Sequence, residues 1–238
     1  AAGLPTPKRV YAHGWLLNKG EKMSKSLGNV VLPEDLVSQY GLDPVRYYLL
    51  REVPFGNDGY ISHETMVARI NSDLANDIGN LAQRSLSMVA KNCDGAVPTP
   101  GPFSEADESL LNAARDVLDS ARDEFNKQAF HRGLEAIWNV VGDANRYVDA
   151  QAPWELRKTD PERMATVLYV LAETIRHLGI LIQPIMPDAA AQMLDQLAID
   201  EDARTFAHLG PNHALTAGSP LPKPAPVFPR YVDEDAAS

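Results

Sequence analysis

Residues 161–182, PERMATVLYVLAETIRHLGILI, place an apolar residue at every third or fourth position. The inward positions are Met164, Leu168, Leu171, Ile175, Leu178 and Ile182. This spacing brings side chains onto one face of an α-helix. Because an apolar face of that width must be buried against other elements, the stretch predicts a helix that packs within a bundle.

The same spacing recurs in three other stretches, at residues 63–91, 104–125 and 127–150. Between the first two, the letters CDGAVPTPGPFS hold prolines and glycines that break a helix. The letters PIMP end the pattern that began at 161, and a short fifth helix is expected at 187–197. These faces together predict an antiparallel helix bundle over residues 63–210. The proline-rich stretch 211–238 is expected to form an extended tail that packs back on the body.

The first 62 residues have a different composition. The letters KRVYAHGWLL at 8–17 mix β-branched, aromatic and apolar residues, which is typical of a strand. Two short helices are expected next, one running from Pro33 to a stop at Gly41 and one with Pro44 in its first turn. We therefore predict a mainly α-helical protein whose first 62 residues hold one strand and two short helices.

The net charge of −10 is concentrated in the later part of the chain. Residues 1–62 carry seven Lys and Arg against six Asp and Glu, whereas residues 63–238 carry fifteen against twenty-six. If the later part binds RNA, it must therefore use a few placed groups and not a broad basic face. A single cysteine, Cys93, excludes an internal disulfide and a cysteine-built zinc site. We expect a cytoplasmic protein with no metal site and no membrane span.

The letters GEKMSKSLG at residues 20–28 place two lysines three residues apart on a loop. The ammonium groups of Lys22 and Lys25 can converge on one polyanion, such as a triphosphate. Lysines placed there stabilise the charge that grows on a departing pyrophosphate, and so they lower the barrier to attack at the α-phosphorus. The alternative is a solvated lysine and serine turn with no ligand.

The other residues of this loop suit the same chemistry. Gly20 and Gly28 would let the loop close over ATP and reopen. The hydroxyls of Ser24 and Ser26 can donate to phosphate oxygens. Met23 is better interpreted as a packing anchor that holds the loop against the body of the protein.

The letters KMSKS resemble the second signature of class I aminoacyl-tRNA synthetases, in which this loop follows a strand at the end of a Rossmann catalytic domain. The resemblance implies that residues 1–26 are the end of such a domain. It further implies that Lys22 and Lys25 stabilise the pyrophosphate of ATP during amino-acid activation, with Lys25 the stronger candidate for the transition state. ATP would arrive as its Mg²⁺ complex.

Two further stretches, GNLAQR at 79–84 and ANRYVDAQAPW at 144–154, resemble the anticodon-binding helices of the methionyl-tRNA synthetases, one family within class I. The resemblance implies that Asn80, Arg84 and Trp154 contact the anticodon of tRNA(Met). It also implies that residues 27–62 form the small α/β connector called the stem-contact fold.

The residues themselves suit this task. Asn80 and Arg84 lie four apart and so share a helix face, where they could bind the Watson–Crick edge or the phosphate of an unstacked cytosine. Trp154 follows Pro153, which is expected to end the helix and present the indole for stacking on a base. Two alternatives remain open: a solvated polar face at Asn80 and Arg84, and a half-buried bundle cap at Trp154.

A class I synthetase also needs a His-x-Gly-His signature and an amino-acid pocket, and the sequence contains neither. By this resemblance the chain is the C-terminal part of an enzyme that activates methionine with ATP and transfers it to tRNA(Met). We expect it to be inactive alone and to need the N-terminal catalytic part, in the same or a separate chain. The alternatives are a non-catalytic tRNA-binding module and another class I synthetase, such as the cysteine, leucine or valine enzyme.

Overall fold

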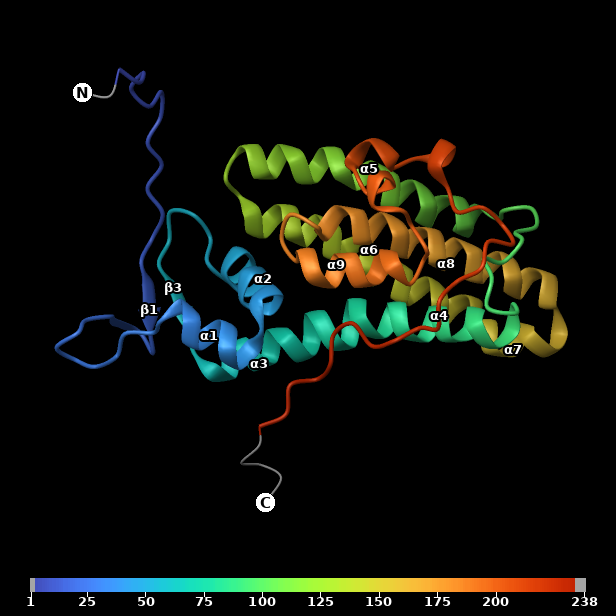
Figure 1. Cartoon of the computed structure of the whole chain (residues 1–238), viewed down its shortest axis with the longest axis horizontal. Coiled ribbons are helices and arrows are strands. Elements are labelled where there is room, and N and C mark those ends of the chain that lie inside the picture. The colour runs from blue at the N-terminus through green and yellow to red at the C-terminus, as the bar shows by residue number, and fades with distance from the viewer. Residues whose placement is uncertain (1–2, 234–238) are drawn as a thin grey trace.

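The computed structural model describes residues 3–233, and most of them are helical (Figure 1). The helices are α1 (Pro33–Tyr40), α2 (Leu42–Glu52), α3 (His63–Arg69), α4 (Asn80–Asn92), α5 (Glu105–Asn126), α6 (Phe130–Gln151), α7 (Pro153–Thr159), α8 (Pro161–Ile182) and α9 (Pro187–Asp195). A π-helical segment, Ile70–Gly79, joins α3 to α4, and three short 3-10 turns, Glu201–Ala203, Phe206–His208 and Pro211–His213, follow α9. The strands are β1 (Leu16–Asn18), β2 (Glu21–Lys22) and β3 (Gly59–Ile61).

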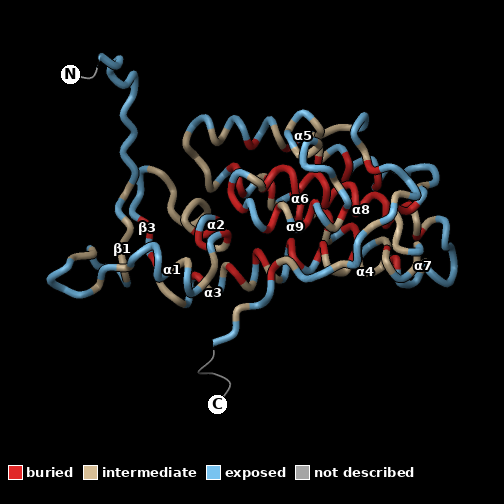
Figure 2. Tube along the Cα trace, viewed as in Figure 1, coloured by how far each residue is buried: buried red, intermediate tan, exposed pale blue. Residues whose placement is uncertain are grey.

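Helix α8 is the centre of the bundle. It is the one described helix long and apolar enough to cross a membrane, but 94% of its most apolar 18-residue stretch is buried inside the protein. Helices α4, α5, α6, α7 and α9 all pack against it, and Figure 2 shows buried residues along their facing sides. The predicted bundle is confirmed, and each of its long helices lies within a few residues of its expected bounds.

A buried ion pair fixes the segment after α9 to α8. The guanidinium of Arg176 donates to both carboxylate oxygens of Glu173, at 2.6 and 3.0 Å, and also to the backbone carbonyl of His208 at 2.7 Å. The same carboxylate accepts from the backbone N–H of Leu215 at 3.0 Å. Because both charges are fully paired, their burial is tolerated, and the pair ties the later chain to the core helix.

The predicted helix at 63–91 forms as one continuous rod whose middle is π-helical. Ser62 begins it with a capping box closed by Thr65. In the wide turns, the N–H of Asn80 donates to the carbonyl of Ala75, five residues earlier. Gly79 allows this path, because a β-carbon there would lie 2.6 Å from the Leu74 carbonyl oxygen. The sequence spacing did not distinguish this widened helix from an ordinary one.

The strand predicted at 8–17 is wrong in extent. Only Leu16–Asn18 forms a strand, which pairs with β3 in parallel and with β2 in antiparallel register. The N–H of Trp15 donates to the Asp58 side chain at 2.7 Å, and Gly14 lies so close to the backbone of Asn57 that a β-carbon would meet its oxygen at 1.9 Å. Residues 8–14 have no ladder partner among the described residues, so the strand pattern there is not realised.

The two short predicted helices, α1 and α2, are confirmed and join the sheet to the bundle. Gly41, with φ of 87°, separates them. Tyr47 on α2 is fully buried; its ring centroid lies 4.5 Å from that of Trp138 on α6, and its hydroxyl donates to Asp73 at 2.8 Å. Arg46 donates to the backbone carbonyls of residues 184 and 185 at 2.8 and 2.7 Å. These contacts hold the small α/β segment against the bundle.

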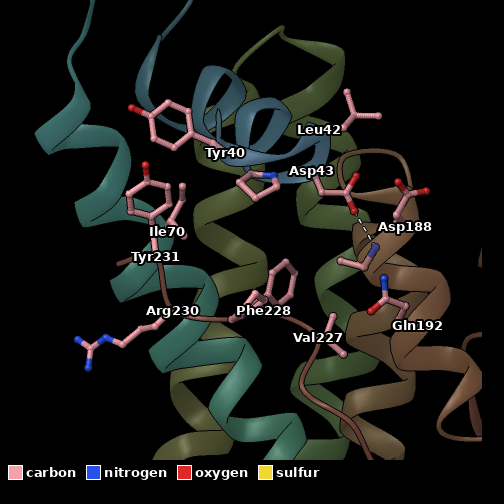
Figure 3. Close-up of a pocket in the computed structure, with 13 residues that line it drawn as sticks. Tyr40, Leu42, Asp43, Ile70, Asp188, Gln192, Val227, Phe228, Arg230 and Tyr231 are labelled. Atoms are coloured by element: carbon pink, nitrogen blue, oxygen red, sulfur yellow. Dashed lines mark hydrogen bonds between the residues drawn. The ribbon is translucent and has the colours of Figure 1, made fainter. Parts of the chain in front are cut away.

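A cleft of about 290 Å³ lies where α1, α2, the π-helical segment, α9 and the tail meet (Figure 3). At its edge, the buried carboxylate of Asp43 accepts from the N–H of Ala189 at 2.6 Å and so caps α9. Tyr231 of the tail closes the other side, where its backbone N–H and carbonyl bond both ends of the Asn71 amide, at 2.9 and 3.1 Å. The tail thus packs back on the body up to residue 233, and its remainder, 234–238, lies outside the described residues.

Two glycines of α6 provide a matched test of packing. A β-carbon at Gly133 would lie 2.2 Å from the Phe125 ring, whereas at Gly142 it would meet only the end of the flexible Arg146 side chain at 3.3 Å. We expect Gly133→Ala to lower the free energy of unfolding by about 1–3 kcal/mol. Gly142→Ala should raise it by about 0.5–1 kcal/mol, because alanine is the better helix former. Urea unfolding followed by circular dichroism measures both, and equal effects would contradict the packing argument.

Candidate functional site

The lysine loop extends beyond the small sheet and is exposed. It leaves β1 through a tight turn in which Lys19 and Gly20 both have positive φ, 50° and 82°. Lys22 ends β2, and its ammonium nitrogen lies 5.0 Å from the centroid of the Trp15 ring. Lys25 lies in the next turn with an exposed side chain, and its carbonyl accepts from the N–H of Gly28 at 3.3 Å. Both lysines are therefore on one short, solvent-facing loop.

Internal hydrogen bonds define the shape of this loop. Asn29 accepts from the N–H of Ser24 at 2.8 Å through its side-chain oxygen and donates to the Lys22 carbonyl at 3.3 Å. The hydroxyl of Ser24 accepts from the N–H of Leu27 at 3.2 Å and lies 3.1 Å from the hydroxyl of Ser26. The Ser24 hydroxyl is thus engaged within the loop, while the Ser26 side chain is exposed.

Met23 lies half-buried at the base of the loop. Its sulfur accepts from the N–H of Val31 at 3.3 Å, and Val31 packs on the smaller apolar cluster beside the sheet. This contact connects the two ends of the loop across its base, next to the glycine at position 28, whose φ is 63°. The turns at both ends therefore have the backbone freedom of glycine, while the base is fixed.

A second group of predicted residues meets at the far end of the bundle. The guanidinium carbon of Arg84, on α4, lies 5.8 Å from the centroid of the Trp154 ring, which is 46% exposed. Arg84 also donates to the carboxylate of Asp149, on α6, at 2.5 Å. Asn80 lies one helical turn before Arg84 and is exposed. The structure brings Arg84 and Trp154 into contact, leaves the indole partly exposed, and places the exposed Asn80 on the same face of α4 as Arg84.

Helix α6 ends at Gln151, just before Pro153 as expected, but Pro153 also begins a new helix, α7. Ala152, with φ of 44°, stops α6 in the left-handed conformation, and its N–H donates to the Val148 carbonyl at 3.1 Å. Pro153 then occupies the first helical position, where its missing N–H costs nothing. Trp154 therefore lies in the first turn of α7 and not at the C-terminal end of α6.

A buried carboxylate, that of Asp107, lies on the core side of the turn between α6 and α7. Asp107, on α5, accepts from both terminal nitrogens of Arg163 at 2.5 and 2.7 Å and from the Tyr147 hydroxyl at 2.5 Å. Burial alone would raise the pKa of Asp107, but the hydrogen bonds from Arg163 and Tyr147 outweigh it and lower the pKa to about 2. Asp107 is therefore ionised at neutral pH and permanently paired.

The two sites lie at opposite ends of the longest axis. Figure 1 shows the lysine loop beyond the small sheet at one end and α7 at the other. An exposed loop with two lysines and an exposed indole at such a separation can contact distant parts of one long ligand, or two ligands at once. Across residues 3–233, the acidic, histidine and cysteine side chains form no group of three that could hold a metal ion.

Two family models match the chain. One, described as tRNA synthetases class I (M), covers residues 1–86, and the other, described as the anticodon binding domain of methionyl tRNA ligase, covers residues 97–238. The chain belongs to the methionyl-tRNA ligase family. The predicted family is thereby confirmed.

Full-length members of the family are closely similar to the chain. The methionine–tRNA ligase of Rhizobium meliloti is 59% identical over 99% of this chain and 46% of the relative. The Mycobacterium tuberculosis enzyme in complex with methionyl-adenylate superposes with a TM-score of 0.91 at 54% identity, covering 96% of this chain and 45% of that structure. Its apo form gives a TM-score of 0.89 at 50% identity, covering 98% and 45%. The chain therefore spans about half the length of the methionyl-tRNA ligases it matches.

Two contacts, one in the lysine loop and one beside Trp154, were not predicted from the sequence of this chain. Asn29 pins the lysine loop, and Asp149 holds Arg84 beside the indole. Asn29 directly follows Gly28, a pairing typical of turns, and Asp149 lies inside the stretch that carried the resemblance. Spacing could not assign either role, because Asn29 contacts nearby backbone within an irregular loop and Asp149 contacts a helix that is distant in the sequence. Nearby on α6, Arg146 pairs with Asp143.

Proposed function

We propose that the chain is the part of a methionine–tRNA ligase that supplies the phosphate-stabilising loop and reads the anticodon of tRNA(Met). The observation that carries the proposal is the exposed Trp154 indole with the Arg84 guanidinium beside it and Asn80 one turn away. A base stacked on the indole would gain about 1–3 kcal/mol. The Asn80 amide offers a donor and an acceptor, and the Arg84 fork offers donors, for the edge or phosphate of the first anticodon base, cytosine.

At the other end, Lys22 and Lys25 would act on ATP while methionine carboxylate attacks the α-phosphorus. Two ammonium groups on one exposed loop can follow the departing pyrophosphate, where negative charge accumulates. Positive φ at Gly20 and Gly28 supports a loop that opens and closes. The hydroxyls of Ser24 and Ser26 would donate to phosphate oxygens, and the Ser24 oxygen can still accept from the N–H of Leu27 while it does so. Mg²⁺ would arrive with ATP as part of the substrate complex.

The enzyme also requires an N-terminal catalytic part, which we propose as the partner of this chain, within the same polypeptide or as a separate one. Exposed apolar side chains beside the sheet support this: Val10 is 86% exposed, and Trp15 and Leu27 are each 65% exposed. We propose the division into residues 1–26, 27–62, 63–210 and 211–238 for the catalytic remnant, stem-contact fold, anticodon-binding bundle and tail. A cytoplasmic location accords with the single, unpaired Cys93.

Binding of RNA hairpins that carry an anticodon tests the proposed anticodon recognition, and it does not require the N-terminal catalytic part. We expect the 238-residue chain to bind a hairpin with the anticodon CAU more tightly than hairpins whose first base is A, G or U. Loss of a paired base edge should weaken binding by about 1–3 kcal/mol, which is roughly 5- to 150-fold. Fluorescence anisotropy with labelled hairpins measures the affinities. Equal affinity for all four hairpins would leave only a general RNA-binding module.

A further inference from the structure

One arginine of the bundle joins three segments around the corner that carries Trp154. The guanidinium of Arg163, in the first turn of α8, makes its double contact with Asp107 of α5 and also donates to the side-chain oxygen of Gln151 at 2.6 Å. Gln151 is the last residue of α6. The backbone N–H of Arg163 donates in turn to Asp160, which caps α8 at 3.0 Å. The end of α6 and the start of α8 are thus tied to the same buried carboxylate.

The segment between these two ends is short and its backbone is constrained. It contains Ala152, an L-residue in the left-handed region at φ of 44°, followed by Pro153 and Trp154. Alanine adopts this conformation only where its surroundings impose it, because its β-carbon crowds the next carbonyl. The Ala152 carbonyl accepts from the N–H of Glu155 at 2.8 Å, which closes the first turn of α7. The direction of the indole therefore depends on where α6 ends, at Gln151, and on where α7 begins, at Pro153.

The anchor of this arrangement is Asp107, a buried carboxylate with several hydrogen-bond partners. Asp107 is fully buried, is held by Tyr147 as well as by Arg163, and receives the N–H of Ser104 at 2.8 Å. Because Asp107 is ionised, its two hydrogen bonds from Arg163 are charge-assisted and strong. One terminal nitrogen of Arg163 contacts both Asp107 and Gln151, so a rigid core group is linked through a single guanidinium to the residue three positions before Trp154.

We propose that Arg163 and Gln151 are positioning residues of the anticodon site: through their hydrogen bond they hold the α6–α7 corner so that Trp154 faces Arg84. The inference rests on the proposed function, because its effect on RNA binding requires that Trp154 stacks on a base. It assigns to α8, a core helix, a role in RNA recognition without any contact between α8 and the RNA.

The test removes the hydrogen bond between Arg163 and Gln151 and leaves the pair of Arg163 and Asp107 unchanged. Gln151→Met keeps the length of the side chain but removes the acceptor, whereas Gln151→Glu keeps an acceptor and should restore the link. Gln192→Met, at an exposed position of α9, is the matched control. The 238-residue chain is labelled with 5-fluorotryptophan, and the ¹⁹F resonances of its three tryptophans are assigned with Trp→Phe variants.

In Gln151→Met, we expect the Trp154 resonance to shift or broaden while those of Trp15 and Trp138 stay in place, and the CAU hairpin to bind about three- to tenfold more weakly. Gln151→Glu and Gln192→Met should leave the Trp154 resonance as it is in the parent chain. An unchanged Trp154 resonance in Gln151→Met would overturn the proposal. So would a moved resonance with unchanged affinity, provided that Trp154→Ala does weaken binding. If Trp154→Ala itself leaves affinity unchanged, the anticodon function fails, and the resonance alone then decides whether Gln151 positions the indole.

Discussion

Lys25→Ala is expected to lower methionine-dependent ATP–pyrophosphate exchange by about 10²–10³-fold in the complete enzyme, the range found when one preorganised donor to a transition-state charge is removed. The Lys25 side chain is exposed on the loop, so its loss should not disturb the fold. Because the interaction is made with charge that develops during the reaction, kcat should fall while the KM for ATP changes little. The exchange assay measures both constants.

The control for this variant is Lys223→Ala, which removes an exposed lysine from the tail and should leave exchange unchanged. Affinity for tRNA(Met) should stay within about twofold in Lys25→Ala, because one solvated lysine contributes little to a multi-contact RNA interface. If Lys25→Ala weakened tRNA binding but left exchange intact, the loop would be a phosphate contact of an RNA-binding module and not part of the catalytic machinery.

The neighbouring lysine differs from Lys25 in the structure. The ammonium of Lys22 lies over the Trp15 ring at 5.0 Å, and its backbone carbonyl is held by Asn29. A residue restrained in this way must leave the indole before it can reach a phosphate, whereas Lys25 is already exposed in a turn. We therefore keep Lys25, chosen from the resemblance, as the stronger candidate for the transition state, and Lys25→Ala tests that choice.

Periodicity predicted the bundle well because the helices are long. In α8, the six positions spaced by three and four are all buried, and so are most residues between them, because helices pack around α8 on several sides. The strand at 8–17 failed for the opposite reason. A strand depends on a neighbour that the local sequence does not specify, and β3 supplies ladder partners only for residues 16–18. Local composition therefore predicts a preference for strand, while distant residues decide its length.

The site residues show the same limit. Asn80 and Arg84 could be placed on one face because both lie on a single helix. That Arg84 meets Trp154 could not be derived from spacing, since it depends on the register of α4 against α6 and on a left-handed turn at Ala152. Pro153 signals that the helix ends near residue 152, but alanine is a strong helix former and does not signal a left-handed turn there. The contact with Asp149 requires the same register and was missed for the same reason.

Trp154→Ala is expected to weaken binding of the CAU hairpin by about 1–3 kcal/mol, or roughly 5- to 150-fold, the cost of removing one base-stacking platform. The indole is 46% exposed, so little core packing is lost with it, and the free energy of unfolding should change by less than about 1 kcal/mol. Trp154→Phe should recover part of the affinity, because a smaller ring still offers a face for stacking. Anisotropy titration of labelled hairpins and urea unfolding measure the two quantities.

Trp138 supplies the matched control, because its ring packs on Tyr47 and its N–H donates to the Asp73 carbonyl at 3.3 Å. Trp138→Phe should therefore lower stability with little effect on hairpin affinity, the reverse of Trp154→Ala. In the complete enzyme, Trp154→Ala should leave methionine activation intact, since the indole and the lysine loop are at opposite ends of the molecule (Figure 1). If instead Trp154→Ala lowered stability and spared hairpin binding, the indole would be a bundle cap, and base recognition would have to be sought elsewhere on the bundle surface.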